Sequence, residues 1–213
     1  MASLYEMRLG LPHISTGEIF RQEITRESAL GRRVKRYVIS GRLVPDALVV
    51  EVMVARLDAK TLATGFVLDG FPRTAGQAAG LDRALQRTRA PLDGAVYLRC
   101  SQALLIRRLS GRRVCANCGA NYHLRTMRPK RPGRCDRCGG SLIIRKDDQA
   151  QTIKKRLEVD RHAAQPLLRY YQRRGELYTV NGAGHVDTVF QRTVRLCEQL
   201  GWLRGRRDDP TPC

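Results

Sequence analysis

The sequence predicts an α/β fold in which short parallel strands alternate with helices, together with a small inserted metal-binding module. Apolar runs at 66–69, 91–98 and 177–180 have the length and composition of buried parallel strands. Apolar residues at helical spacing fill much of the chain between them. Two Cys-x-x-Cys pairs within 115–138 predict the module. The 213 residues are enough for one core of ordinary size and such an insertion.

The stretch Gly65–Thr74 carries the first sign of chemistry. Its apolar run ends in Asp69, and Gly70 and Pro72 predict a turn at that point. In open α/β sheets, ligands bind at the carboxyl ends of the strands, where Asp69 would lie. Arg73 follows with a planar guanidinium suited to phosphate. The alternative is a plain surface turn with a solvated Arg.

The charge balance favours an anionic partner. Lys and Arg number 39 against 20 Asp and Glu, so the formal net charge is +19, and the basic residues run from Arg8 to Arg207. Polyphosphate nucleotides and nucleic acid both fit this excess, as do ordinary solvated faces. No apolar run is long enough to predict a membrane span, and the N-terminus lacks an apolar signal core. The spacing of four cysteines suits a metal site better than disulfides, and such a site fits a reducing compartment. We therefore expect a cytoplasmic protein.

Capping signals predict two helices before residue 58. One begins at Ser15–Thr16, where Glu18 stands at capping-box spacing from Ser15. The other follows the turn Gly41–Asp46, with Asp46 as its cap.

An Arg-rich helix is predicted over 103–113. It would place Arg108 and Arg112 four residues apart on one face, where an anion between them would relieve their repulsion. A solvated basic face is the alternative. Asp147 and Asp148 are predicted to cap the next helix or to pair with nearby arginines.

The C-terminal third is predicted to be largely helical. Arg145 and Arg156 are three helical turns apart and would share a face of a continuous helix. A break is predicted at Pro166. A closing helix covers 189–200, and residues 204–213 are predicted to be a frayed tail.

The two Cys-x-x-Cys pairs are the most specific pattern that spacing alone provides. Four thiolates at this spacing suit tetrahedral Zn²⁺ in a closed structural site, which would fold the module without doing chemistry; redox disulfides or an iron–sulfur cluster are alternatives. Neither Cys197 nor Cys213 is expected to bind the metal. The predicted ligands are Cys115, Cys118, Cys135 and Cys138.

The module could also be a nucleic-acid-binding ribbon. Its long loop carries many basic residues, and Tyr122 could stack on a base. These basic residues are Arg125, Arg128, Lys130, Arg131 and Arg134.

Two segments resemble the adenylate kinase family. Asp69-Gly-Phe-Pro-Arg-Thr74 with Gln77 is similar to that family's signature, and Pro12-His-Ile-Ser-Thr-Gly-Glu18 is similar to the start of its monophosphate-binding part. The likeness extends from about residue 10 to 202. It implies a P-loop NTPase-like parallel sheet flanked by helices and a reversible phosphoryl transfer from ATP to AMP. The implied parts are a core (1–14, 59–111 and 149–203), a helical AMP-binding flap (15–58) and a zinc-binding lid (112–148).

The resemblance also implies the residues that bind AMP. Thr16 and Gln77 would contact adenine, Arg21 and Arg73 its phosphate, and 42–44 the base and ribose. A Gln amide has the donor and acceptor that pairing with an adenine edge requires, although an isolated Gln is more often a surface residue. The full implied set is Thr16, Arg21, Arg42, Leu43, Val44, Gly70, Phe71, Pro72, Arg73, Gln77, Arg145 and Arg156.

ATP would be bound largely by the lid. The resemblance implies that two arginines clamp its phosphates and that lid residues and a C-terminal turn meet its adenine; these residues are Arg108, Arg112, Asn121, Tyr122 and Gly184. Catalysis would rest on positive charge, with Asp69 orienting ATP-bound Mg²⁺ through water. The implied catalytic residues are Asp69, Arg73, Arg108, Arg112, Arg145 and Arg156. The implied partners are ATP, AMP and ADP, with no nucleic acid or membrane, and the expected state is a monomer.

One part of the family pattern is absent from the sequence. No segment matches G-x-x-x-x-G-K-[ST], the loop that holds ATP phosphates, and the family's first strand is missing with it. A misassigned start, or a real truncation with impaired activity, would explain this. Three other functions stay open: a zinc-ribbon nucleic-acid binder, a catalytically dead AMP-binding kinase relic, and a kinase for another monophosphate.

Overall fold

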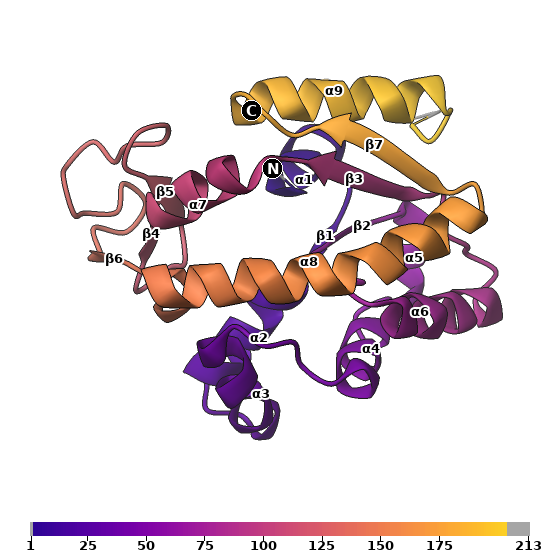
Figure 1. Cartoon of the computed structure of the whole chain (residues 1–213), viewed down its shortest axis with the longest axis horizontal. Coiled ribbons are helices and arrows are strands. Elements are labelled where there is room, and N and C mark those ends of the chain that lie inside the picture. The colour runs from indigo at the N-terminus through magenta and orange to yellow at the C-terminus, as the bar shows by residue number, and fades with distance from the viewer. Residues whose placement is uncertain (1, 204–213) are drawn as a thin grey trace. The chain divides into compact units, whose positions relative to one another are not determined.

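A computed structural model describes residues 2–203, so the predicted tail at 204–213 lies outside the described residues. Its contacts divide the chain into two compact units. Figure 1 labels the helices and strands. The first unit contains Met1–Ile19, Pro45–Arg99 and Ala163–Cys213, and the second contains Phe20–Val44 and Cys100–His162. Across residues 2–203, no helix combines the length and apolar character needed to cross a bilayer.

Parallel strands form the centre of the first unit. β1 (His13–Ser15) pairs with β2 (Val67–Asp69), so that Ser15 lies opposite Asp69. β3 (Ala95–Arg99) pairs with β7 (Leu177–Asn181) along its whole length. The predicted α/β class and its parallel strands are therefore confirmed.

The strands make two separate pairs instead of the single sheet that the sequence suggested. Within residues 2–203, no strand joins β1–β2 to β3–β7. Parallel sheets are normally buried on both faces, yet among the residues of these four strands Val180 alone is buried. Each of these four strands has one paired neighbour within residues 2–203, so its other backbone edge is unpaired.

Helices cover the strand pairs of the first unit. α1 (Ala2–Leu9) packs on α9 (Val186–Gln199), with the Tyr5 and Phe190 rings edge to face at 5.1 Å. Burial raises the pKa of Tyr5 to about 12, as expected for an apolar site. α4 (Asp46–Val54), α5 (Ala59–Thr64) and α6 (Ala75–Arg87) complete the unit with the second half of α8 (Ala150–Arg173).

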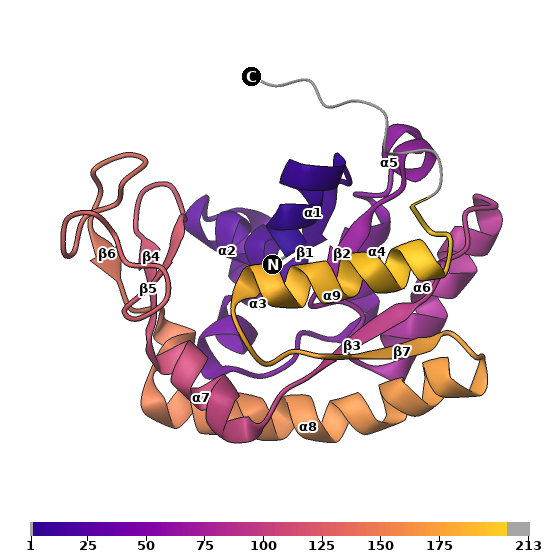
Figure 2. The ribbon, with the colours of Figure 1, turned by 90° about the horizontal axis from the view of Figure 1, so that it is seen from above.

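The second unit joins helices to a small antiparallel sheet. α2 (Thr16–Thr25) enters it at Phe20, and α3 (Ala29–Ser40) and α7 (Gln102–Ser110) follow. β4 (Arg112–Cys115) lies between β5 (Asn121–His123) and β6 (Leu142–Ile143). Figure 2 shows these short strands and their long loops at the left. The short 3-10 helix η1 (Lys146–Asp148) then leads into α8. We call β4, β5, β6 and their loops the three-stranded module.

Two helix predictions were wrong, and the continuous helix on which a third depended is not formed. α7 ends at Ser110 and is capped by Gly111. Arg112 lies on β4, where it pairs with β5, and so it shares no helix face with Arg108. Arg145 precedes η1, so it is not on one helix with Arg156. α8 runs unbroken through Pro166 because the proline removes a single helix hydrogen bond, which packing can outweigh.

Candidate active site and metal centre

The turn after β2 brings three of the predicted AMP-binding residues together. The Gly70 carbonyl accepts hydrogen bonds from Arg73 Nε at 2.8 Å and from Thr16 Oγ1 at 3.0 Å. Gly70 has φ +69°, and a Cβ there would come within 3.1 Å of Arg73 Nη2. Glycine is therefore required both for the left-handed backbone and for the close approach of the guanidinium.

Gln77 lies in a polar network beneath this turn and is only 2% exposed. Its Oε1 accepts from the Arg73 backbone N–H at 2.8 Å, and its Nε2 donates to Asp46 Oδ1 at 2.9 Å. Thr74 Oγ1 donates to Asp46 Oδ2 at 2.7 Å. An amide offers two donors and two acceptor sites, so one of each is left on Gln77 after these two bonds.

Asp46 was predicted only as a helix cap, and that prediction was wrong. Pro45 is the N-cap of α4, where no side chain caps the helix, and the Asp46 carboxylate instead binds Thr74 and Gln77. No sequence pattern indicates this role, because Asp46 and Gln77 meet only when α4 packs against α6.

Asp69 lies at the end of β2 beside His13, a residue that the sequence analysis did not select. His13 Nε2 lies 3.3 Å from Asp69 Oδ2, and the Asp69 side chain is 56% exposed. The hydrogen bond lowers the pKa of Asp69 and raises the pKa of His13. The exposed part of the carboxylate fits a Mg²⁺ bound with nucleotide phosphates, since Mg²⁺ takes few protein ligands and keeps several waters.

This pair predicts a pH window in stability. The raised His13 pKa contributes stability that is complete below 6.5 and lost as the pH rises through the folded value; the lowered Asp69 pKa contributes stability present above 3.8 and lost in more acid solution. His13→Gln should therefore lower the unfolding free energy most between pH 4 and 6.5, by about 0.5–1 kcal/mol. Urea unfolding of both proteins from pH 4 to 9 measures this. A difference that does not vary with pH would contradict it.

Three arginines of the second unit share a region of excess positive charge. Burial, with Arg21 and Arg112 nearby, lowers the pKa of Arg145 to about 10. Arg145 Nη2 donates to Asn121 Oδ1 at 2.8 Å, while its buried Nε has no hydrogen-bond partner among the described residues. A buried donor without a partner is costly. The site is thus suited to an anion that would supply both charge and acceptors.

Asp147 and Asp148 pair with Arg156 and Arg112. Pairing with nearby arginines was one of the two roles predicted for them. Arg112 binds the buried Asp148 carboxylate through Nε and Nη2 at 2.6 and 2.5 Å. Arg156 Nη1 lies 3.2 Å from Asp147 and 3.9 Å from Asp148. These carboxylates fix the guanidinium groups in place, as bidentate pairs do.

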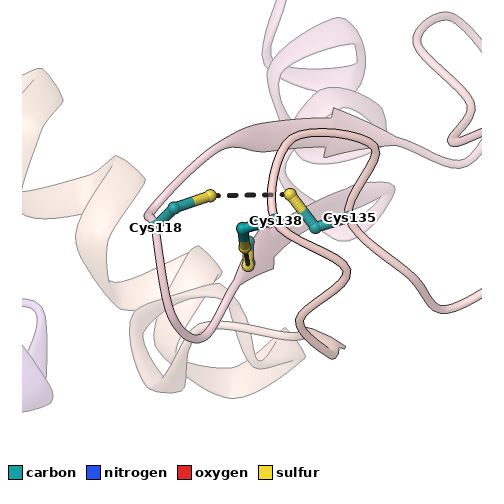
Figure 3. Close-up of side chains that lie close together, drawn as sticks. Cys118, Cys135 and Cys138 are labelled. Atoms are coloured by element: carbon teal, nitrogen blue, oxygen red, sulfur yellow. Dashed lines mark hydrogen bonds between the residues drawn. The ribbon is translucent and has the colours of Figure 1, made fainter.

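The four cysteines of the three-stranded module form one cluster. Their Sγ atoms all lie within 4.8 Å of one another, with Cys115–Cys138 at 3.4 Å and Cys118–Cys135 at 3.5 Å. Figure 3 shows the Cys118 and Cys135 sulfurs pointing at each other. A tetrahedral zinc site with bonds of about 2.3 Å needs sulfurs about 3.8 Å apart. The donor set and its spacing therefore fit Zn²⁺, with no position left for a substrate.

Tyr122 belongs to this cluster. It is 8% exposed, its hydroxyl oxygen accepts from the Asp136 N–H at 2.7 Å, and it lies 3.5 Å from Cys135 Sγ. This hydroxyl lowers the pKa of Cys135 to about 6, which favours the thiolate that binds metal. The ring is thus a structural part of the metal centre, whereas Asn121 is exposed and reaches Arg145.

The remaining predicted residues are distributed over both units. In the second unit, Arg42 is exposed, with its guanidinium 5.9 Å from the Tyr37 ring, and Arg108 Nη1 contacts Cys100 Sγ at 3.8 Å. In the first unit, Phe71 is buried. The remaining placements are Leu43 half-buried, Val44 buried and Pro72 half-buried. Since Arg73 is in the first unit and the other four catalytic arginines are in the second, their convergence remains a prediction.

Gly184 lies in the turn between β7 and α9, with φ +111°. Arg192, which the sequence analysis did not select, holds this turn: its Nη1 donates to Asn181 O at 3.0 Å and to Ala183 O at 2.6 Å. The turn is therefore fixed to the first turns of α9.

Parallel strands, an Asp-Gly turn and grouped arginines are the features of a nucleoside monophosphate kinase, a class of phosphotransferases. The adenylate kinase family model matches residues 2–176. The chain is 43% identical over 190 residues to an adenylate kinase of Clostridium tetani, covering 89% of this chain and 88% of that protein. It is 41% identical over 188 residues to one of Thermosipho melanesiensis, covering 88% of each. The chain belongs to the adenylate kinase family.

Proposed function

We propose that the protein transfers a phosphoryl group reversibly from ATP to AMP, giving two ADP. An AMP phosphate oxygen forms a bond to the γ-phosphorus of ATP while the bond from that phosphorus to the β–γ bridging oxygen breaks. No side chain has to act as a nucleophile, so positioning and positive charge do the work. The observation that carries the proposal is the grouping of Arg145 with Arg21 and Arg112, where the buried Nε of Arg145 has no hydrogen-bond partner among the described residues.

The residues divide into two binding sets. Arg73 and Arg21 hold the AMP phosphate, Thr16 and Gln77 face its base, and 42–44 contact its base and ribose. Arg108 and Arg112 hold ATP phosphates, and Arg145 and Arg156 act on the transferring group. Asn121 and Gly184 lie along the ATP adenine. The Tyr122 hydroxyl already contacts Cys135 and Asp136, so we assign Tyr122 a structural role and no contact with ATP.

Two metal ions accompany this function. Mg²⁺ would be held with ATP near Asp69, where it would neutralise part of the phosphate charge. Zn²⁺ would be held by the four clustered cysteines and supplies folding energy to the three-stranded module. We further propose a cytoplasmic monomer with the core, flap and lid that the sequence analysis defined, because thiolate zinc sites suit a reducing compartment.

Binding of AMP tests the proposal directly. The sequence contains no Gly-rich P-loop, so calorimetric titration with AMP is the measurement, as it does not depend on ATP. Arg73→Ala should weaken AMP binding about 10- to 100-fold, the loss of one or two charge-assisted hydrogen bonds, and change stability much less. Arg83→Ala, which removes an exposed Arg of α6, is the matched control and should bind AMP normally.

Two outcomes would contradict the proposal. Tighter binding of another nucleoside monophosphate would change the acceptor. Salt-sensitive retention on RNA or DNA, unaffected by AMP, would favour the zinc-ribbon alternative.

A further inference from the structure

The orientation of the Gln77 amide is fixed by its two partners. Its oxygen faces the Arg73 N–H at 2.8 Å and its nitrogen faces Asp46 Oδ1 at 2.9 Å. A backbone N–H can only donate, and an ionised carboxylate can only accept. If the amide rotated by half a turn, its oxygen would face the carboxylate and its NH₂ would face the N–H. Both contacts would then be repulsive, so one orientation is strongly preferred.

The remaining hydrogen-bonding groups of Gln77 therefore have a fixed order. One lone pair of Oε1 and one N–H of Nε2 are left for a ligand. Adenine presents an amino donor at C6 next to an acceptor at N1. Guanine and hypoxanthine present a carbonyl acceptor at C6 next to an N–H donor at N1. An amide locked in one orientation matches one of these two orders and opposes the other.

We propose that Asp46 is a positioning residue that sets the preference for adenine over 6-oxopurines by locking the Gln77 amide. This inference rests on the proposed function, in which Gln77 faces the base of AMP. Asp46 itself would touch no substrate. It would act through Gln77, by making one of the two amide orientations unfavourable.

The structure holds Asp46 rigidly enough for this role. Thr74 Oγ1 donates to Asp46 Oδ2 at 2.7 Å and also accepts from the Gln77 backbone N–H at 3.1 Å, so one threonine ties the carboxylate to the start of α6. A Cβ at Gly76 would lie 2.6 Å from Asp46 Oδ2, which leaves no room for a side chain there.

The α4–α6 contact maintains this arrangement. A Cβ at Gly80 would lie 2.9 Å from Val50 Cγ2, so the two helices pack as closely as glycine permits. With Gln77 only 2% exposed, water has little access to replace the partners of the amide. The donor and acceptor order at the base is thus set by the fold and not by the ligand.

Asp46→Asn tests the inference. An Asn at this site offers either an oxygen or an NH₂ group to Gln77, so only the Arg73 N–H would still oppose the flipped amide. In titrations with AMP, GMP and IMP, we expect the preference for AMP over GMP and over IMP to fall about tenfold, which corresponds to about 1.4 kcal/mol. AMP should bind more weakly and the 6-oxopurine nucleotides relatively better.

Val50→Ala is the matched control, because it loosens the same helix contact without touching the amide. It should weaken all three nucleotides by similar factors and leave the preference intact. Thr74→Val is a second variant, in case Asp46→Asn does not fold; it releases one carboxylate oxygen and should shift the preference in the same direction by less. An unchanged preference in the folded variants would overturn the inference while AMP binding by the unaltered protein stands. Absence of AMP binding by the unaltered protein would instead overturn the proposed function, and this inference with it.

Discussion

Loss of zinc should unfold the three-stranded module and leave the parallel strand pairs of the first unit folded. The apolar cluster of the module is very small: its buried residues are Cys115, Tyr122 and Cys135, with Ala120 and Leu142 packed against it. Structural zinc sites contribute on the order of 10 kcal/mol to the folding of small domains. Without the metal, the cluster would be held by weak contacts among the four thiols and by the Asp136 N–H bond to the Tyr122 hydroxyl. The module therefore depends on the ion far more than on burial.

The variant Cys135→Ser tests this dependence on zinc, because Cys135 is both buried and in contact with Tyr122. We expect zinc content to fall from one ion per chain to almost none. Amide hydrogen exchange should become fast over residues 112–143 and remain slow in β3 and β7. Cys100→Ser, which alters a thiol outside the cluster, is the control and should keep its zinc. Full zinc content in Cys135→Ser would contradict the assignment of the ligands.

Local patterns in the sequence were sufficient for the elements that depend on few residues. The run ending in Asp69 became β2, and the strands at 95–99 and 177–181 fell within or beside the predicted runs. Ser15 accepts from the Glu18 N–H at 3.4 Å, as the capping spacing predicted. The Cys pairs could be recognised because metal geometry requires a fixed spacing that packing does not alter.

Features set by long-range packing could not be predicted in the same way. The helix proposed over 103–113 ended early because Arg112 and Arg113 found strand partners at His123 and Tyr122. α8 continued past Pro166, since tertiary contacts outweigh one missing hydrogen bond. The link between Asp46 and Gln77 joins residues 31 positions apart, and no periodicity reports such a pair. The charge excess was visible in composition, but its concentration around Arg145 was not.

Arg145 should prove to be the most important charge for phosphoryl transfer and among the least important for folding. Its guanidinium is held near Arg21 and Arg112, and its lowered pKa reflects burial and the repulsion of those neighbours. Arg145→Met should therefore cost little stability or add to it. The same change removes a donor aimed at developing negative charge, so turnover in a coupled assay should fall about 10²- to 10³-fold.

Ligand stabilisation separates this role from a general effect of positive charge. Inorganic tripolyphosphate should raise the melting temperature of the unaltered protein, because it compensates the charge near Arg145, and should do so much less in Arg145→Met. Arg131→Met removes the same charge from an exposed position in the three-stranded module and is the matched control. If both variants lost turnover and tripolyphosphate stabilisation equally, the net charge of +19 would be attracting the anion non-specifically. If only Arg145→Met lost them, the half-buried Arg145 guanidinium, whose Nε has no acceptor among the described residues, would be the group that meets the phosphates.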